Sequence, residues 1–444
     1  MADIRSFRAL HYNLERTQLG EVVTQPYDKI SPAMQERYYQ LSPYNLVRII
    51  KGQEHPTDMP QDNVYTRAAQ QFQDWIQSRI LISDSKPALY PYYQEYTVPG
   101  QSGIRKERRG FIALCRLEDY AAGVVHRHEE TLAGPKQDRL ELLKATRAHF
   151  GQIFMLYSDT EGKVESTLQA RAASRVWEQV TDEYGSRHSV WRVSEPGLVA
   201  AVTAAMRAKK LIIADGHHRY ETALVYRDHC REQGRTDSLA EYVMVTLVRM
   251  ESEGLTILPT HRIVRGLPRF DWGRFAAEVR PFFEWEDLKF TGSGAERYAR
   301  IAESLAQAGR DGPTFGVTAG NDKVARLSLR RDLDLAGLLP DVPKPLRQLD
   351  VVLLHRLLLE KVLGIDNQAV REEKNLRYVR EMADAVAEVI EGRAQVSFMM
   401  NPTPIEAVRD NAFAGYVLPQ KSTDFYPKLL SGLTAYWLDQ PGGE

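Results

Sequence analysis

Two hydrophobic periods alternate along most of this chain. Apolar runs typical of strands cover residues 45–50, 88–98, 109–117, 152–157, 210–215, 242–248, 255–258 and 397–400. Segments with a helical period cover residues 32–41, 64–80, 134–150, 217–233 and 350–363. A Pro-Gly turn between 88–98 and 109–117 predicts a hairpin. The alternation predicts a mixed α/β fold.

After Gly266-Leu267-Pro268, helix and strand patterns continue but contain few unusual polar clusters. We expect a catalytic α/β domain over residues 1–265. A second α/β domain is expected over 266–444, with a last motif that returns to the site. The apolar helix at 350–363 is expected to be structural.

Charge and cysteine content narrow the class of protein. The 444 residues include 58 Lys+Arg against 59 Asp+Glu, which is untypical of a polybasic nucleic-acid-binding protein. The chain has no apolar run of about 18 residues and no signal-peptide core, so we expect a cytoplasmic protein. Cys115 and Cys230 lack CxxC spacing and are expected to be packing residues.

Common catalytic motifs are absent from the sequence. It contains no GxxxxGK[ST], GxGxxG, GxSxG or HExxH. These absences disfavour P-loop kinases, Rossmann dehydrogenases, α/β-hydrolases and zincins.

The sharpest polar cluster is IADGHHRYE at 213–221, where an apolar strand runs through a glycine into a helix. The N–H groups of a helix start attract phosphate. Asp215 is placed to hold Mg²⁺ or to act as a base, and Arg219 can form two hydrogen bonds with phosphate. The alternative is that Asp215 caps the helix and the histidines are surface residues. The candidates are Asp215, Gly216, His217, His218, Arg219 and Glu221.

A second cluster, HRHEET at 126–131, contains His128 and Glu129 and precedes a predicted helix. Lys136, Arg139 and Arg147 share one face of that helix. Either these cations extend into solvent or they bind an anion.

Two further motifs carry candidates. Asp28 in QPYDK at 25–29 is either a turn residue or part of the site. In PQKSTDFYPK at 419–428, Lys421 and Ser422 form a workable phosphate-binding pair. We expect Lys421 to reach the Asp215 pocket; the alternative is a capped helix that starts near Asp424.

The motifs together resemble a bacterial family known as domain of unknown function 1015. The resemblance covers nearly the whole chain. It rests on IRSFRAL at 4–10, QPYDKIS at 25–31, GFIALCRLEDY at 110–120, HEETLAGPKQDRLELLKATRAHFG at 128–151, IADGHHRYETAL at 213–224, LPTHRIV at 258–264 and PQKSTDFYPKLLSGL at 419–433.

The Asp215-Gly216-His217-His218-Arg219 box is also similar to that of the ParB/sulfiredoxin-like superfamily, which includes free-serine kinases. This second resemblance implies a ParB/sulfiredoxin-like catalytic core. It further implies phosphoryl transfer involving a small hydroxyl substrate such as L-serine. Those kinases are shorter than this chain, and the position of their catalytic glutamate has no assigned match in this sequence.

The sequence therefore favours a Mg²⁺-dependent phosphotransferase, with ATP, ADP or pyrophosphate as donor. Asp215 and Glu221 are the expected metal ligands, and Glu129 is the expected base, with Asp28 or His128 as substitutes. The other cluster members would support this chemistry: His217 and His218 as catalytic groups, and Gly216, Arg219, Lys136, Arg139, Arg147, Lys421 and Ser422 as phosphate ligands.

Two other classes of function remain as alternatives. A metal-dependent hydrolase would use His217, Glu221 and Asp215 around Zn²⁺ or Mn²⁺. A ParB-like nucleotide-gated DNA-binding protein is opposed by the net charge of −1. The partners expected are a small-molecule substrate and its phosphoryl donor, with no membrane; the sequence leaves an oligomer open.

Overall fold

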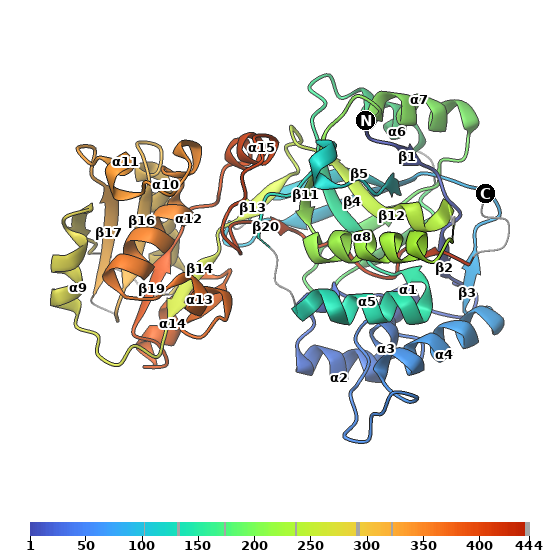
Figure 1. The fold of residues 1–444 in the computed structure, drawn as a ribbon, viewed down its shortest axis with the longest axis horizontal. Helices are drawn as coiled ribbons and strands as arrows, with labels where there is room; N and C mark the ends of the chain where they lie inside the picture. Colours follow the sequence, from blue (N-terminus) through green and yellow to red (C-terminus); the bar gives the residue numbers. More distant parts are fainter. Residues whose placement is uncertain are drawn as a thin grey trace. The chain divides into compact units, whose positions relative to one another are not determined.

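The computed structural model describes residues 1–101, 103–130, 134–172, 175–235, 238–289, 294–320 and 323–439. It contains two compact units, coloured along the chain in Figure 1. Unit 1 comprises Met1–Arg127, Thr131–Thr256 and Pro427–Glu444, and unit 2 comprises His128–Glu130 and Ile257–Tyr426. The chain thus enters unit 2 briefly at 128–130, and its last segment belongs to unit 1. The mixed α/β class predicted from the alternating periods is confirmed.

Unit 1 is built on a nine-stranded sheet in the order β6-β11-β8-β12-β5-β4-β10-β9, with β1 beside β5. β11 pairs in parallel with β6 and antiparallel with β8, and β4 and β5 form the predicted hairpin. The strands are β1 (Ile4–Arg5), β4 (Tyr90–Thr97), β5 (Arg105–Arg116), β6 (Val125–His126), β8 (Ile153–Tyr157), β9 (Glu178–Thr181), β10 (Arg187–Val190), β11 (Leu211–Asp215) and β12 (Tyr242–Arg249). Smaller pairings join β2 (Leu10–Tyr12) to β3 (Leu81–Ser83) and β7 (Ala148–His149) to β21 (Tyr436–Trp437).

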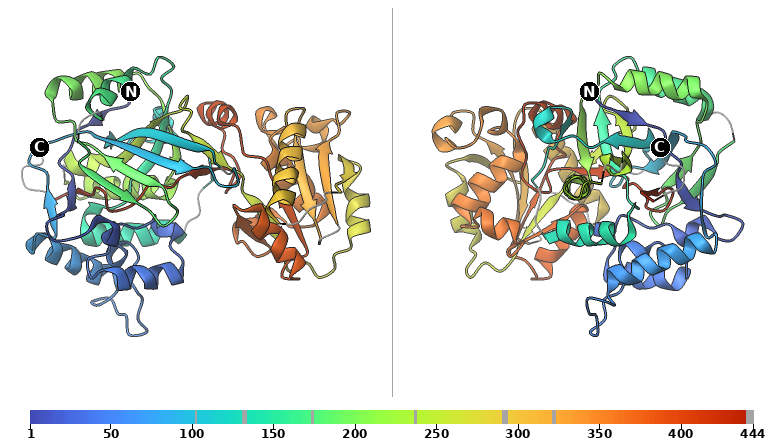
Figure 2. Two further views of the ribbon diagram at one scale, coloured as in Figure 1. Left: turned by 180° about the vertical axis from the view of Figure 1, so that it is seen from behind. Right: turned by 45° about the vertical axis from the view of Figure 1, so that its right-hand side comes forward.

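Helices cover both faces of this sheet (Figures 1 and 2). α6 and α7 cover one face, and α8 covers the other, with α5 and then α4 beyond it. A buried cluster joins Ile153 and Ile213 of the sheet to Val164 of α6 and Val202 of α7. The helices are α1 (Leu19–Val22), α2 (Pro32–Leu41), α3 (Val47–Ile50), α4 (Val64–Gln77), α5 (Gly134–Thr146), α6 (Lys163–Ala172), α7 (Pro196–Met206) and α8 (His217–Glu232).

Two expectations about unit 1 are wrong. Residues 45–50 were predicted as a strand, but Val47–Ile50 is a helical turn. The cause is local: the Asn45 side chain accepts a hydrogen bond from the Val47 N–H at 3.0 Å and so starts the turn. The helix predicted to reach residue 150 ends at Thr146, because Arg147 takes a left-handed conformation with φ of 49°.

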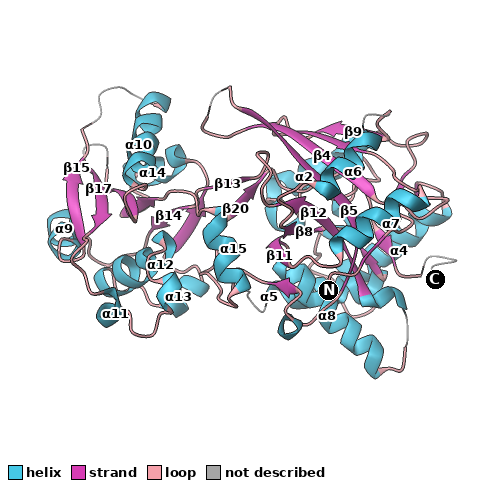
Figure 3. Cartoon of the chain, turned by 90° about the horizontal axis from the view of Figure 1, so that it is seen from above, coloured by secondary structure: helices cyan, strands magenta, loops and turns pink. Residues whose placement is uncertain are grey.

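Unit 2 contains a six-stranded antiparallel sheet in the order β15-β17-β16-β19-β14-β18. Figure 3 shows α10 and α14 on one side of it and α9 and α12 on the other. The strands are β14 (His261–Val264), β15 (Phe283–Asp287), β16 (Thr314–Thr318), β17 (Val324–Leu329), β18 (Leu376–Val379) and β19 (Val396–Met399), with a separate pair of β13 (Thr256–Leu258) and β20 (Asp424–Tyr426). The helices are α9 (Trp272–Val279), α10 (Ala295–Ala308), α11 (Leu335–Leu338), α12 (Asp350–Leu353), α13 (Asn367–Arg371), α14 (Met382–Ile390) and α15 (Ile405–Phe413).

One prediction in unit 2 is refined and one alternative is wrong. The apolar helix predicted at 350–363 is present, but from Leu354 to Val362 it has π-helical geometry. The alternative of a capped helix starting near Asp424 is wrong, since Asp424–Tyr426 is a strand.

Two further predictions concern membrane-spanning segments and the two cysteines. Within the described part of the chain, none of the helices combines the length and apolar character needed to cross a bilayer. Cys115 and Cys230 are both buried and form no disulfide, as expected of packing residues.

Candidate functional site

The first polar cluster has the predicted local structure. β11 ends at Asp215, Gly216 turns the chain with φ of 92°, and α8 begins at His217. The N-cap residue, Gly216, has no side chain that could cap this helix. Gly216 thus occupies the N-cap position of α8, and Asp215 precedes it as the last residue of β11.

Cations surround the Asp215 carboxylate. Its Oδ2 lies 3.7 Å from Nη2 of Arg219 and 3.8 Å from Nζ of Lys428. Burial raises the pKa of Asp215, but Lys428, Arg219 and Lys29 together hold it well below its usual range. Asp215 is therefore ionised at neutral pH, with positive charge in excess around it.

Two glycines make room for the Arg219 side chain. A Cβ on Gly216 would lie 2.9 Å from Nη2 of Arg219, and a Cβ on Gly151 would lie 3.0 Å from its Nη1. The guanidinium donates a hydrogen bond to the backbone carbonyl of Gln152. Arg219 is therefore fixed between the start of α8 and the residues that lead into β8.

Buried side chains of β4 and β5 hold the segment that carries Lys428. Arg108, only 1% exposed, donates to the Pro427 carbonyl at 2.5 Å and to Oε1 of Gln94 at 3.0 Å. The Gln94 amide donates to the Lys428 carbonyl at 2.9 Å. Burial lowers the pKa of Arg108 to about 10, so it still carries a charge at neutral pH.

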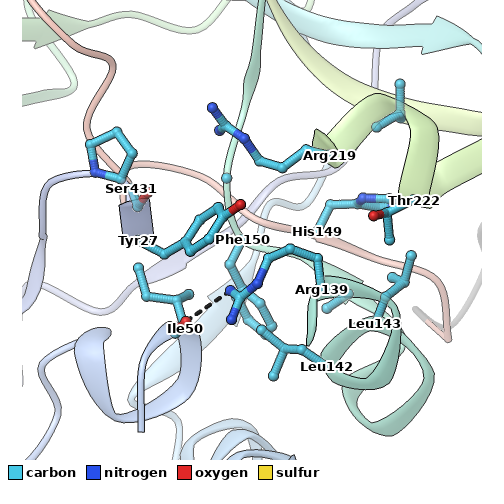
Figure 4. Close-up of a pocket in the computed structure, with 14 residues that line it drawn as sticks. Tyr27, Ile50, Arg139, Leu142, Leu143, His149, Phe150, Arg219, Thr222 and Ser431 are labelled. Atoms are coloured by element: carbon cyan, nitrogen blue, oxygen red, sulfur yellow. Dashed lines mark hydrogen bonds between the residues drawn. The ribbon is translucent and has the colours of Figure 1, made fainter. Parts of the chain in front are cut away.

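A pocket of about 60 Å³ lies beside this charge cluster (Figure 4). Tyr27, Arg139 and Arg219 line it, and the Arg139 guanidinium stacks 4.1 Å from the Tyr27 ring centroid. Arg139 also donates to the Ile50 carbonyl at 2.8 Å, drawn as the dashed line. Ser431 contributes from the C-terminal segment. The volume is that of a few water molecules or of one small anion in their place.

The third sequence cluster therefore lies near the first. Burial raises the pKa of Tyr27, and the neighbouring Asp28 raises it further, whereas Arg139 and Arg219 lower it. Asp28 itself is exposed at the edge of this group. QPYDK thus contributes Tyr27 and Lys29 to the surroundings of Asp215.

The expected stripe of three cations on α5 does not form. Lys136 makes an ion pair with Glu221 of α8, and the Tyr120 hydroxyl donates to the same carboxylate at 3.4 Å. Arg147, beyond the end of the helix, pairs with Asp439 at 2.7 Å. Of the three cations, Arg139 is the one that lines the pocket.

The second and fourth clusters meet in unit 2. The His128 ring nitrogen Nε2 lies 2.8 Å from the Thr423 hydroxyl, and the Glu129 carboxylate accepts a hydrogen bond from the Lys421 N–H at 2.8 Å. The Ser422 hydroxyl donates to the Pro419 carbonyl. Glu129, His128, Lys421 and Ser422 all belong to unit 2, so their predicted roles at Asp215 stay predictions.

The predicted metal ligands are only partly supported by their surroundings. In the described ranges, no three His, Cys, Asp or Glu side chains are grouped so that they could hold a metal ion. Glu221 is already paired with Lys136, and the half-buried His217 acts on Asp215 as a neighbouring charge. His218 is also half-buried, so the two histidines are not simply surface residues. A single carboxylate still fits Mg²⁺, which commonly takes its other ligands from phosphate and water.

Sequence reasoning missed Lys428, Lys29, Arg108 and Gln94. Lys428 and Lys29 lie within the motifs at 419–428 and 25–29. The candidates predicted from these two motifs are instead Lys421, Ser422 and Asp28. Arg108 and Gln94 are polar residues in strands, and only the pairing of β4 with β5 brings them to Lys428. No local pattern marks such residues.

Comparison with known proteins identifies a family but no activity. A family model described as a protein of unknown function, DUF1015, matches residues 4–352. None of the curated proteins matches the chain.

Several solved structures show a distant similarity to this chain. A conserved hypothetical protein from Pyrococcus furiosus is 13% identical with a TM-score of 0.35, over 73% of this chain and 94% of that one. A free serine kinase in complex with AMP is 13% identical with a TM-score of 0.37, over 72% and 92%. SbnI from Staphylococcus aureus, truncated at its C-terminus, is 10% identical with a TM-score of 0.36, over 74% and 90%.

Proposed function

The chain belongs to the DUF1015 family, and we propose that it is a Mg²⁺-dependent phosphotransferase acting on a small hydroxyl metabolite. The observation that carries this proposal is the excess of positive charge around the ionised Asp215. Lys428 and Arg219 lie within 4 Å of one carboxylate oxygen, at 3.8 and 3.7 Å. An anion that enters beside them meets cations and the start of a helix, the arrangement that binds phosphate.

Asp215 gives this site a place for a divalent cation. A bound Mg²⁺ would neutralise charge on the phosphate oxygens. The chain itself would orient the phosphoryl group through Arg219, fixed by its bond to the Gln152 carbonyl, and through Arg139, fixed by its bond to Ile50. Preset donors of this kind stabilise developing charge without reorganisation.

The proton of the substrate hydroxyl needs a base. Asp28 is the candidate within unit 1, on the same turn as Tyr27. Glu129 and His128, the other bases expected from the sequence, belong to unit 2, and their role stays a prediction. L-serine is the first substrate to test, because the Asp215-Gly216-His217 box resembles that of free-serine kinases.

A hydrolase with a three-ligand transition-metal site is the weaker alternative. It requires His217, Glu221 and Asp215 around one ion, and no such group exists among the residues that the structure describes.

A ligand screen tests the proposal. Thermal stability of the full chain is measured with Mg²⁺ and phosphate, pyrophosphate, ADP, ATP, L-serine or O-phosphoserine. Ligand that binds the native state raises the melting temperature. We expect phosphate-bearing ligands to stabilise the wild type, and Arg219→Gln to lose that shift. Arg231→Gln, on the exposed side of the same helix, is the matched control. Equal shifts in Arg219→Gln and the wild type would contradict the assignment.

A further inference from the structure

A second pocket lies wholly within unit 2. It encloses about 180 Å³ between the π-helical segment Leu354–Val362, α13 and the chain before β20. Val342, Leu346, Val352 and Val370 supply apolar walls. This volume is below that of a pocket for a drug-sized ligand and suits a small metabolite.

His355 gives this pocket an unsatisfied polar group. The side chain is 5% exposed and lines the cavity, and its Nε2 is buried with no hydrogen-bond partner among the described residues. Burial lowers the pKa of His355 to about 3, so the ring is neutral. A neutral imidazole nitrogen can accept a hydrogen bond from an ammonium group or donate one to a carboxylate. An unsatisfied buried nitrogen is unfavourable, so a ligand that pairs with it gains affinity.

The backbone around His355 is also unusual. Leu354–Val362 follows α12 with π-helical geometry. Such geometry is rare and occurs frequently at functional sites. Both His355 and Arg356 of this segment line the pocket, although they are adjacent in sequence.

Charges of both signs line the same cavity. Arg356 pairs with Asp341 at 2.5 Å, and Arg371 pairs with Glu130 at 3.0 Å. In each pair, the guanidinium can bind the carboxylate of a ligand, and the carboxylate can bind its ammonium group. The walls between them are aliphatic, so the lining matches a molecule that carries both charges on a small apolar body.

We propose that this pocket of unit 2 binds an aliphatic α-amino acid as a zwitterion. Its carboxylate lies against Arg371 and Arg356, its ammonium against Glu130 and Asp341, and its side chain against the valines. His355 completes the polar contacts through Nε2. The site does not depend on the proposed phosphotransfer, because it uses none of the residues assigned to that reaction.

Isothermal titration of the full chain with L-valine tests this site, with no phosphoryl donor present. We expect saturable binding, and binding at least tenfold weaker for 3-methylbutanoate, which lacks the ammonium, and for 2-methylpropylamine, which lacks the carboxylate. Arg371→Gln, at a half-exposed position, and His355→Phe are each expected to weaken L-valine binding about tenfold.

Arg393→Gln is the matched control, because Arg393 is an exposed arginine of unit 2 whose partners Glu391 and Glu388 lie outside the pocket. It should bind L-valine as the wild type does. Absence of saturable binding would overturn the proposal, as would equal affinity for the two singly charged analogues. Unchanged affinity in folded Arg371→Gln would also overturn it, and this variant gives a result even if His355→Phe fails to fold.

Discussion

Nζ of Lys428 lies 3.8 Å from Oδ2 of Asp215, so the last part of the chain supplies a cation to the turn between β11 and α8. Arg108 and Gln94 hold the Lys428 segment by its backbone carbonyls. The Lys428 side chain thus approaches the Asp215 carboxylate. This contact ties the C-terminal motif to the candidate site of unit 1.

Replacing Lys428 should weaken the site more than replacing Lys421. We expect Lys428→Gln to reduce binding of a phosphate-bearing ligand by about 1–3 kcal/mol, the scale of hydrogen bonds to charged groups. The same change should raise the pKa of Asp215, because Lys428 lowers that pKa more than any other cation around it. Titration calorimetry with ADP or pyrophosphate measures the first effect.

Lys421→Gln is the comparison that decides between the two lysines of the motif. If Lys421→Gln loses more affinity than Lys428→Gln, the sequence-based choice of Lys421 is right, and Lys428 is not the cation that binds phosphate.

Arg139 and Lys136 should differ, although they share one helix. Arg139→Ala is expected to lower phosphate affinity by about 1–3 kcal/mol, because this side chain lines the pocket next to Tyr27. Lys136→Ala should change affinity less, since Lys136 is paired with Glu221. Phosphate affinities of the two variants, measured side by side, check this. Equal losses of affinity would mean that both cations bind the anion, as predicted from the sequence.

Much of the fold could be predicted from hydrophobic period alone. The run Leu211–Asp215 and the following helix are strong patterns because the strand is almost wholly buried and the turn residue is glycine. Residues 45–50 misled the prediction because a single Asn45 hydrogen bond converts an apolar run into a helical turn. Hydrophobic period alone does not take account of a turn-forming side chain such as that of Asn45.

The candidate site was less predictable than the fold. Asp215, Gly216 and Arg219 stand together in sequence, so their chemistry could be recognised directly. Lys428 reaches Asp215 only through the buried support of Arg108, and that support depends on long-range pairing. The left-handed Arg147 could not be foreseen, because arginine has no preference for that conformation.

Gly216 should tolerate no side chain. Its φ of 92° is unfavourable for other residues, and a Cβ would contact the Arg219 guanidinium at 2.9 Å. We expect Gly216→Ala to lower the free energy of unfolding by about 1–3 kcal/mol. Gly197→Ala is the control, because that glycine lies in α7 and a Cβ added to it would have no atom within 4 Å. Urea unfolding compares the two, and equal stabilities would show that the turn is not constrained.

A buried ion cluster away from the candidate site gives unit 1 a pH-dependent stability. Burial lowers the pKa of His11, but Asp84 and Glu178 outweigh it and raise the pKa to about 9. A raised folded-state pKa stabilises the protein fully below the unfolded value of about 6.5, and this stabilisation is lost as pH rises through about 9.

The variant His11→Gln should therefore be less stable than the wild type at pH 6 by roughly 1–3 kcal/mol. The difference should shrink between pH 6.5 and pH 9. Urea unfolding at several pH values measures it, with the exposed His55→Gln as control. A difference that grows with pH would mean that His11 is neutral in the folded protein.

The most direct measurement is phosphoryl transfer itself in wild type and Asp215→Asn. The full chain is incubated with Mg²⁺, L-serine and ATP, ADP or pyrophosphate, and O-phosphoserine is detected by ³¹P nuclear magnetic resonance. The amide keeps the shape of Asp215 but removes the charge that Mg²⁺ needs. We predict O-phosphoserine from the wild type with one of these donors and none from folded Asp215→Asn. No transfer by the wild type with any donor, or equal turnover by Asp215→Asn, would contradict the proposed phosphotransfer at Asp215.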